Sequence, residues 1–396
     1  MQMNRRQALR LLAALGTTGL VSGCASFLGD DDLSDGPVRI GMLVPQGGRN
    51  KPVGDEIRKG FELYLDLHDN RLGGRPVELV VADEGNSVDD TLSGIESLLE
   101  QDVLALTGVV DSEIMLGIRD TVEQAKVPLL GCAASPQALQ GVVYIWRTSY
   151  VDDEFGLALG SHVAGEVRGD VAIVAENYRL CQDVVTGFRQ SFGESDPRIA
   201  AQTIWTPYVA DPDEGTYADA IREIRNRDPE AVFCAFSGPA AVTFIKQLRA
   251  AGFRGSNKKI YGPGFLTEGT VLDELGKDAV GIRTALNYSA DLRTGANRRF
   301  VAAWSDRNDT PPTTYAVSSY DAAQVLDKAI RLAGERLDSQ ELLLALGKVG
   351  QIDSPRGVWQ FNQPRTPLQT WYLREVRRDG QVLSNVVIAE LTILGR

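Results

Sequence analysis

Residues 38–44 read VRIGMLV, a run in which Arg39 is the only polar side chain. A near-continuous apolar run of this length is typical of a strand buried on both faces, inside a parallel sheet that helices cover. A loop with several glycines and prolines follows, and then a helical pattern with Ile57, Phe61 and Leu65 on one stripe. The stretch predicts the first strand–loop–helix unit of an α/β fold.

The same unit recurs along the chain, in two successive sets. A first set of predicted strands continues at 77–81, 103–106, 127–130 and 142–146, and a second set follows at 171–174, 199–205, 231–236 and 259–262. Helical patterns separate most of these strands. Regular alternation favours parallel sheets with helices on both faces, so the two sets predict two doubly wound α/β lobes.

The last hundred residues have a different pattern. Helices are predicted near 296–308 and 315–333, and strands at 357–361, 368–377 and 382–390. The last two strands flank Asp379-Gly380, a common hairpin turn, and are expected to pair antiparallel.

Length and charge limit the functional classes. The chain has 396 residues, enough for two domains, and 41 basic against 53 acidic residues give a net charge of −12. An acidic body repels phosphate backbones, so we expect no nucleic-acid partner. Two histidines and four scattered cysteines show no metal-ligand spacing, and we expect neither a metal nor a cofactor.

The N-terminus resembles an export signal. Residues 4–10 (NRRQALR) are basic, residues 11–20 (LLAALGTTGL) form an apolar run too short to span a bilayer, and Val21-Ser22-Gly23-Cys24 resembles a bacterial lipobox. We therefore expect a lipoprotein signal peptide over 1–23, lipid on Cys24 and attachment to the outer face of the cell membrane. Either the general secretory or the twin-arginine route fits this signal.

The segment after Cys24 supports that interpretation. Residues 25–36 (ASFLGDDDLSDG) carry four acids and cannot bury a core, so 24–36 reads as a solvated tether. The alternative, a buried N-terminal helix with a core cysteine, is less consistent with this acidic segment.

The loops at the carboxyl ends of the strands are where open parallel sheets bind ligands. The loop 108–112 opens a helix, whose free N–H groups and Ser112 hydroxyl could hold a polar or negative ligand group. Alternatively, Asp111 or Ser112 caps that helix. These loops supply the candidate solute-binding residues, namely Pro52, Asp111, Ser112, Cys132, Ala133, Ala134, Tyr178, Ser237, Gly264 and Phe265.

Evidence for catalysis is weak. His68 and His162 fall in predicted helices, where structural roles are the more common ones. Glu84, Asp111 and Glu176 follow strands but form no recognisable catalytic pair, and no Ser/His/Asp order is present. We expect a binding protein rather than an enzyme, with an exported enzyme as a minor alternative.

Several motifs, in order, resemble type I periplasmic solute-binding proteins of the branched-chain amino acid family. They are the first strand, GGRPVELVVAD (73–83), the serine loop 108–112, AASP (133–136), Arg147-Thr148, and AAGFRG (250–255) followed by YGPG (261–264).

The resemblance implies a two-lobe clamp with three hinge crossovers, in which lobe 1 holds 37–148 and 287–359 and lobe 2 holds 149–286 and 360–396. It further implies that a small organic solute stabilises the closed clamp and that an ABC permease in the membrane recognises it. A sensory receptor of the same fold is the alternative, and neighbouring permease or sensor-kinase genes would separate the two.

The chain departs from the family at the positions that hold an amino acid. Ala134 stands where the family has a threonine, Gly264 where it has an acid, and Val53, Leu180 and Ser237 where it has tyrosines. An amine without these partners loses charge-assisted hydrogen bonds of about 1.5–3 kcal/mol each. A simple α-amino acid is therefore disfavoured. Asp111 or Glu176 could supply a substitute charge, and a larger or less polar solute is equally open.

Overall fold

The computed structural model describes residues 36–213, 215–255, 258–380 and 382–395. The chain divides into the units 1–35 and 36–396, and the second is described here. The predicted signal peptide, Cys24 and nearly all of the predicted tether lie outside the described residues. Within them, no helix is both long and apolar enough to cross a bilayer.

Lobe 1 is built on a six-stranded sheet with the strand order β2-β3-β1-β4-β5-β6. All neighbours are parallel except β2 and β3. Its elements are β1 (Val38–Val44), α2 (Lys51–Leu67), β2 (Arg71–Leu72), β3 (Arg75–Asp83), α3 (Val88–Leu99), β4 (Ala105–Gly108), α4 (Ser112–Ala125), β5 (Leu129–Gly131) and β6 (Ile145–Arg147).

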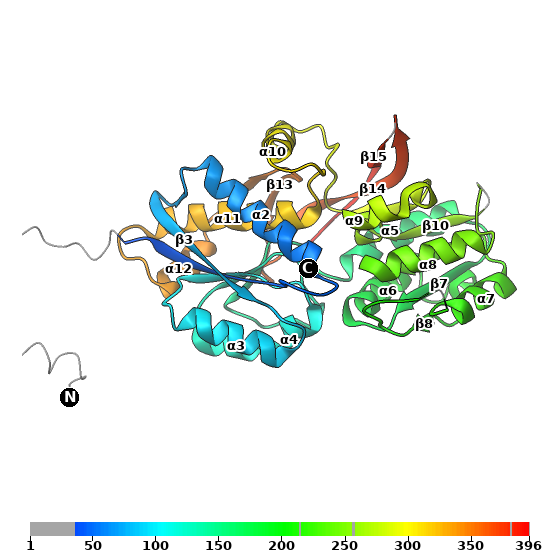
Figure 1. The fold of residues 1–396 in the computed structure, drawn as a ribbon, viewed down its shortest axis with the longest axis horizontal. Coiled ribbons are helices and arrows are strands. Elements are labelled where there is room, and N and C mark those ends of the chain that lie inside the picture. Colours follow the sequence, from blue (N-terminus) through cyan, green and yellow to red (C-terminus); the bar gives the residue numbers. More distant parts are fainter. Residues whose placement is uncertain (1–35, 214, 256–257, 381, 396) are drawn as a thin grey trace, which may run out of the picture. The chain divides into compact units, whose positions relative to one another are not determined.

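Both faces of β1 are buried, as its apolar run predicts. Ile40 and Met42 face a cluster with α2 and α11 (Thr314–Ala333), whereas Leu43 faces a separate cluster with α3 and α4. The contact between α2 and α11 joins segments some 250 residues apart in sequence, and they lie side by side in Figure 1. Gly60 permits this approach, because a Cβ there would stand 2.2 Å from the carbonyl oxygen of Ala316.

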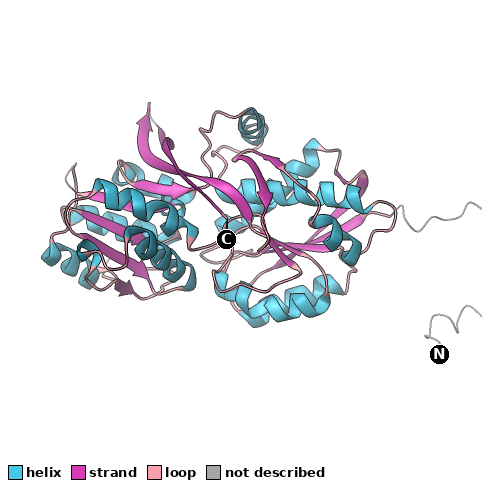
Figure 2. Ribbon diagram, turned by 180° about the vertical axis from the view of Figure 1, so that it is seen from behind, coloured by secondary structure: helices cyan, strands magenta, loops and turns pink. Residues whose placement is uncertain are grey.

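Lobe 2 is built on a second sheet, whose parallel part has the order β11-β10-β9-β7-β8. Helices lie on both of its faces (Figure 2). Its elements are α5 (Glu154–Glu166), β7 (Val171–Glu176), α6 (Arg179–Phe192), β8 (Ile204–Thr206), α7 (Ala218–Arg227), β9 (Ala231–Ala235), α8 (Gly238–Ala250), β10 (Lys259–Pro263), the 3-10 turn η2 (Gly264–Thr267), α9 (Thr270–Leu275) and β11 (Arg283–Leu286).

The C-terminal region connects the two lobes. Helices α10 (Gly295–Ser305), α11 and α12 (Ser339–Leu346) are followed by β12 (Ile352–Ser354) and β13 (Gly357–Phe361), whose Trp359 is buried in the core of lobe 1. Strand β14 (Pro367–Asp379) pairs with β13 at its start and with β11 further along, and β15 (Val382–Leu394) completes the predicted hairpin. The exact lobe edges given above stay predictions.

The two-lobed α/β architecture is confirmed, but two predicted strands are wrong in extent. The strand expected at 142–146 is observed only as Ile145–Arg147. Residues 199–205 were expected to be a strand, but the chain forms a 3-10 turn, η1 (Pro197–Ile199), and pairs only at Ile204–Thr206. Pro197 has a fixed φ and no N–H for a sheet, and the Asp196 side chain caps the turn by accepting from the N–H of Arg198. Strand β11, four residues long, was not predicted.

Candidate functional site

A cavity of about 550 Å³ lies where the strands of both sheets end, the position that open parallel sheets favour for ligands. Lobe 1 contributes Gly48, Arg49, Asn50, Pro52, Val53, Asp55, Glu56, Lys59, Val110, Ser112, Ala133 and Ala134. Lobe 2 contributes Tyr178, Leu180, Tyr208, Ala210, Asp211, Ser237, Gly238, Pro239, Phe265, Glu268, Gly269, Thr270, Val271 and Glu274. Tyr150 and Asp152 follow the first crossover, and Thr310, Thr313 and Tyr315 lie at the start of α11.

Seven of the ten candidate residues line this cavity, namely Pro52, Ser112, Ala133, Ala134, Tyr178, Ser237 and Phe265. The other three lie behind its wall. Cys132 is buried with its Sγ 3.2 Å from the hydroxyl of Thr107. Gly264 is packed against Leu286, and Asp111 caps α4.

The N-terminus of α4 is already occupied by side chains of the protein. Asp111 accepts hydrogen bonds from the N–H groups of Glu113 and Ile114, at 2.8 and 3.1 Å. The buried carboxylate of Glu84 accepts from the N–H groups of Val110 and Asp111, both at 2.8 Å. The N–H groups that the sequence offered to a ligand are therefore largely satisfied, which supports the capping alternative for Asp111.

Arg49 is a site residue that the sequence did not reveal. It belongs to the loop after β1 in lobe 1, yet its guanidinium forms a two-pronged ion pair with Glu176 of lobe 2, at 2.6 and 2.9 Å. It also donates to the carbonyl oxygens of Val209 (3.0 Å) and Ser237 (2.7 Å) and lies 4.7 Å from the ring centre of Tyr208.

Burial acts against the charge of both partners of this ion pair, and it raises the pKa of Glu176 above its usual value although Arg49 opposes that effect. Burial disfavours the guanidinium cation, but the hydrogen bond and charge of Glu176 outweigh burial and raise the pKa of Arg49 above its usual value. The pair is almost fully buried, with side-chain exposures of 5% and 0%. Because its partners lie on opposite lobes, it joins the lobes directly.

Two acids of the cavity differ from Glu176 in their partners. Asp152 accepts from the hydroxyl of Ser112 at 2.7 Å and from the N–H of Ser135 at 3.3 Å, and burial raises its pKa to about 8. Glu56 accepts from the hydroxyl of Thr313 at 3.2 Å, and burial raises its pKa to about 7. Sequence analysis missed both, since neither directly follows a predicted strand.

Aromatic rings form much of the remaining wall. Tyr178 and Tyr208 stack with their ring centres 4.6 Å apart, and the Tyr178 hydroxyl donates to Asp111 at 3.0 Å. Tyr150, Phe265 and Tyr315 complete the aromatic lining. Flat apolar surfaces of this kind suit the body of a small organic solute.

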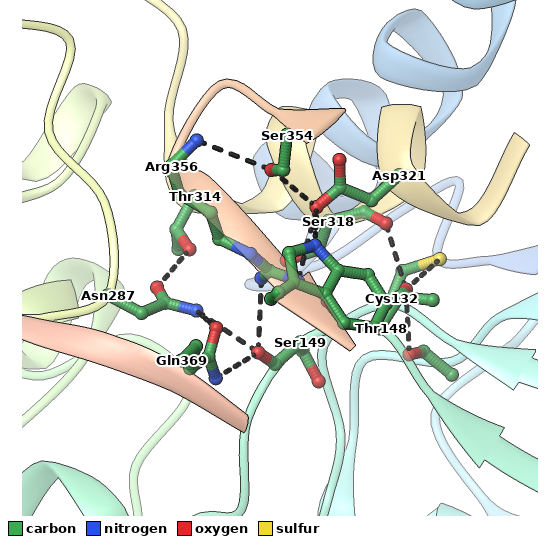
Figure 3. Close-up of polar contacts among 12 residues, drawn as sticks. Cys132, Thr148, Ser149, Asn287, Thr314, Ser318, Asp321, Ser354, Arg356 and Gln369 are labelled. Carbon is green, nitrogen blue, oxygen red and sulfur yellow. Dashed lines mark hydrogen bonds and ion pairs between the residues drawn. The ribbon is translucent and has the colours of Figure 1, made fainter. Parts of the chain in front are cut away.

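The three crossovers between the lobes meet in a buried hydrogen-bond network (Figure 3). The carbonyl oxygen of Ser149, on the first crossover, accepts from Asn287 on the second (3.0 Å) and from Gln369 on the third (2.9 Å). Arg356 donates to the carbonyls of Thr148 and Ser149, at 2.6 and 3.1 Å, and pairs with Asp321 at 3.1 Å. Such a network defines how the three chain segments cross.

The described residues offer little for catalysis. Within that part of the chain, no three His, Cys, Asp or Glu side chains are placed to hold a metal ion. His68 stacks on Tyr64 and His162 contacts Glu166, while Cys132, Cys181 and Cys234 are buried free thiols.

Comparisons with known proteins agree with this geometry. The profile of the periplasmic binding protein family matches residues 37–381. A Leu/Ile/Val-binding protein homolog of Brucella melitensis is 24% identical over 348 residues, covering 86% of this chain and 88% of the relative.

Solved structures with the same fold include solute-binding proteins of ABC transporters. One from Rhodopseudomonas palustris, in complex with benzoate, is 27% identical with a TM-score of 0.81, covering 91% of this chain and 98% of that one. The leucine-binding protein LivK of Thermotoga maritima, 19% identical with a TM-score of 0.78, covers 89% and 98% and shares the fold.

Proposed function

The chain belongs to the periplasmic binding protein family, and from this membership we propose that it is an exported, lipid-anchored receptor that captures a small organic solute between its lobes and delivers it to an ABC permease. Its relatives are binding proteins of transporters, and the chain is not an enzyme.

One observation carries the proposal, namely the cavity with walls from both lobes. A solute in this cavity would contact Ser112 of lobe 1 and Phe265 of lobe 2 at once. In an open form the solute contacts only one lobe. Binding therefore favours closure by the free energy of the additional contacts that the second lobe makes with the solute. Closure then gives a permease a surface that differs between the empty and the loaded receptor.

A solute screen tests the proposal. We expect at least one small organic solute, from a library that includes benzoates and branched-chain amino acids, to raise the melting temperature of the purified chain. At a concentration a hundredfold above Kd the stabilisation amounts to about 2.7 kcal/mol. Failure of every solute in thermal-shift and calorimetric measurements would contradict the proposal.

A pair of aromatic variants locates the binding. Tyr208 lines the cavity, and Tyr208→Ala is expected to weaken binding of the solute that the screen identifies about fivefold to tenfold through lost ring contacts. Trp205 lies on nearby β8, is similarly exposed (44% against 42%) and is absent from the cavity wall, so Trp205→Ala serves as the control with unchanged affinity.

The lipid anchor rests on the sequence around Cys24. The basic, apolar and small-residue segments before it, and the acidic segment after it, support cleavage and lipidation at this cysteine. We expect labelled fatty acid to be incorporated into the expressed chain and Cys24→Ser to abolish incorporation and release the protein from the membrane. Equal labelling of both chains would refute the anchor.

A further inference from the structure

We propose that the solute of this cavity is an organic cation, with an ammonium, amidinium or guanidinium group on an aromatic or similarly flat apolar body. The inference rests on the proposed function, since it names the class of solute that the same cavity takes. Four features of the wall lead to it: its basic groups, the helix terminus beside it, its acids and its rings.

The basic side chains of the cavity offer little to an anion. In the part of the chain that the structure describes, Arg49 and Lys59 are the basic residues of the wall. Arg49 already holds both oxygens of Glu176, and it also contacts the carbonyls of Val209 and Ser237, the Ser237 hydroxyl and the face of Tyr208. Lys59 is exposed, where water screens its charge.

The helix terminus beside the cavity is also occupied. A helix N-terminus attracts anions through its free N–H groups and its dipole. Asp111 accepts from the N–H groups of Glu113 and Ile114 in the first turn of α4, and Glu84 accepts from those of Val110 and Asp111 just before the helix. Burial raises the pKa of Glu84 to about 8, so the negative charge at this helix terminus comes from Asp111. A carboxylate solute would meet repulsion at this position instead of vacant donors.

Two acids of the cavity, Asp152 and Glu56, by contrast form no ion pair, whereas Glu268 is paired with Arg374 and Asp55 with Lys51. No described basic side chain lies within ion-pair distance of Asp152 or Glu56, which accept hydrogen bonds from the hydroxyls of Ser112 and Thr313 and from backbone N–H groups. Glu268 on lobe 2 is near enough for its charge to oppose ionisation of Glu56 on lobe 1. A cation between the lobes would relieve this repulsion and pair with a buried acid.

The rings of the wall suit the same solute. Five aromatic residues line the cavity, namely Tyr150, Tyr178, Tyr208, Phe265 and Tyr315. The face of an aromatic ring attracts a cation, as the guanidinium of Arg49 over Tyr208 illustrates here. Flat apolar surfaces next to unpaired acids match a flat apolar body with a cationic head.

Three ligands of nearly the same shape separate charge from size. Benzamidine is cationic at neutral pH, benzamide is neutral and benzoate is anionic. By calorimetry at pH 7.5 we expect affinity to fall in that order, with benzamidine at least tenfold tighter than benzoate. The reverse order, or a best-binding library solute that is neutral or anionic, overturns the inference and leaves the proposed function intact. Absence of any binding overturns the proposed function itself.

Release of a proton from Asp152 or Glu56 when the cation binds is a second measurement, independent of the affinity order of the three ligands. Burial holds Asp152 largely protonated at neutral pH, with the negative groups Asp153 and Asp183 adding to this effect and the donors Ser112 and Ser135 opposing it. Around Glu56, Glu268 opposes ionisation while Lys59 and Thr313 favour it. A cation that pairs with either acid displaces a proton. Benzamidine affinity should rise with pH, by up to about tenfold per unit below pH 8, and its binding enthalpy should depend on the buffer.

Two isosteric variants complete the test. Asp152→Asn removes the charge while keeping a polar side chain beside Ser112, and we expect it to weaken benzamidine binding roughly 10- to 100-fold. Glu176→Gln instead frees the cation of Arg49 but also breaks the ion pair between the lobes, so both ligands lose the same closure energy and the ratio of benzoate to benzamidine affinity should rise. A melting temperature near that of the parent shows that each variant is folded. Unchanged ligand preference in both folded variants would refute the inference.

Discussion

The Arg356→Met chain is expected to lose about 3–5 kcal/mol of stability, because it leaves the buried carboxylate of Asp321 without its cation. Side-chain exposures are 1% for Arg356 and 0% for Asp321, so water cannot replace the missing partner. The variant also loses two hydrogen bonds to the carbonyls of Thr148 and Ser149 and the contact with the ring of Trp359, 5.0 Å away. Urea unfolding measures the loss.

A second pair at the surface is the matched control for Arg356. Arg299 and Asp353 also form an ion pair, at 3.5 Å, but with exposures of 73% and 66%, so Arg299→Met should change the free energy of unfolding by no more than about 1 kcal/mol. The double variant Arg356→Met/Asp321→Asn should lose less free energy of unfolding than Arg356→Met and Asp321→Asn lose together as single variants, since no unpaired charge remains. Equal losses for Arg356→Met and Arg299→Met would refute this account of the hinge.

The Arg49→Met chain is expected to bind its solute up to about 100-fold more weakly, through loss of the ion pair between the lobes. The pair forms only when the loop after β1 meets Glu176, so it stabilises the closed form over the open one. When the clamp opens, water can solvate Glu176, so the cost falls on closure more than on folding. Calorimetry with the best solute of the screen measures the change.

Two further variants show whether the weaker binding comes from loss of the ion pair or from loss of a side chain that lines the cavity. Lys59 is the other basic residue of the wall and is exposed, so Lys59→Met is expected to change affinity about twofold or less. In Arg49→Met/Glu176→Gln no buried charge is left unpaired, so the double variant should recover part of the lost affinity. Equal losses in Arg49→Met and Lys59→Met would contradict a role for Arg49 in closure.

The fold could be predicted from the sequence because its signals are local. The run 38–44 is observed as β1 with the same bounds, since a strand buried on both faces has no need of polar residues. The hairpin around Asp379-Gly380 followed from turn chemistry. Short strands such as β11 carry too few residues for a pattern, and Pro197 altered the start of β8.

The candidate site could be predicted only in part, because its chemistry depends on long-range pairing. Most of the strand-end residues do line the cavity, as the architecture of parallel sheets requires. Arg49 and Glu176, however, are 127 positions apart, and no sequence pattern shows that the guanidinium crosses to the other lobe. The same holds for Glu84, whose position 27 residues before Asp111 gives no sign that it accepts from the N–H groups of Val110 and Asp111, just before α4.

A crystal structure of the purified chain with the tightest solute of the screen tests most directly whether the two lobes enclose a solute. The account predicts density for the solute in the cavity, in contact with Ser112 on the lobe 1 side and with Asp152, Tyr208 and Phe265 on the lobe 2 side. A solute bound elsewhere on the protein, with this cavity filled by water alone, would contradict it.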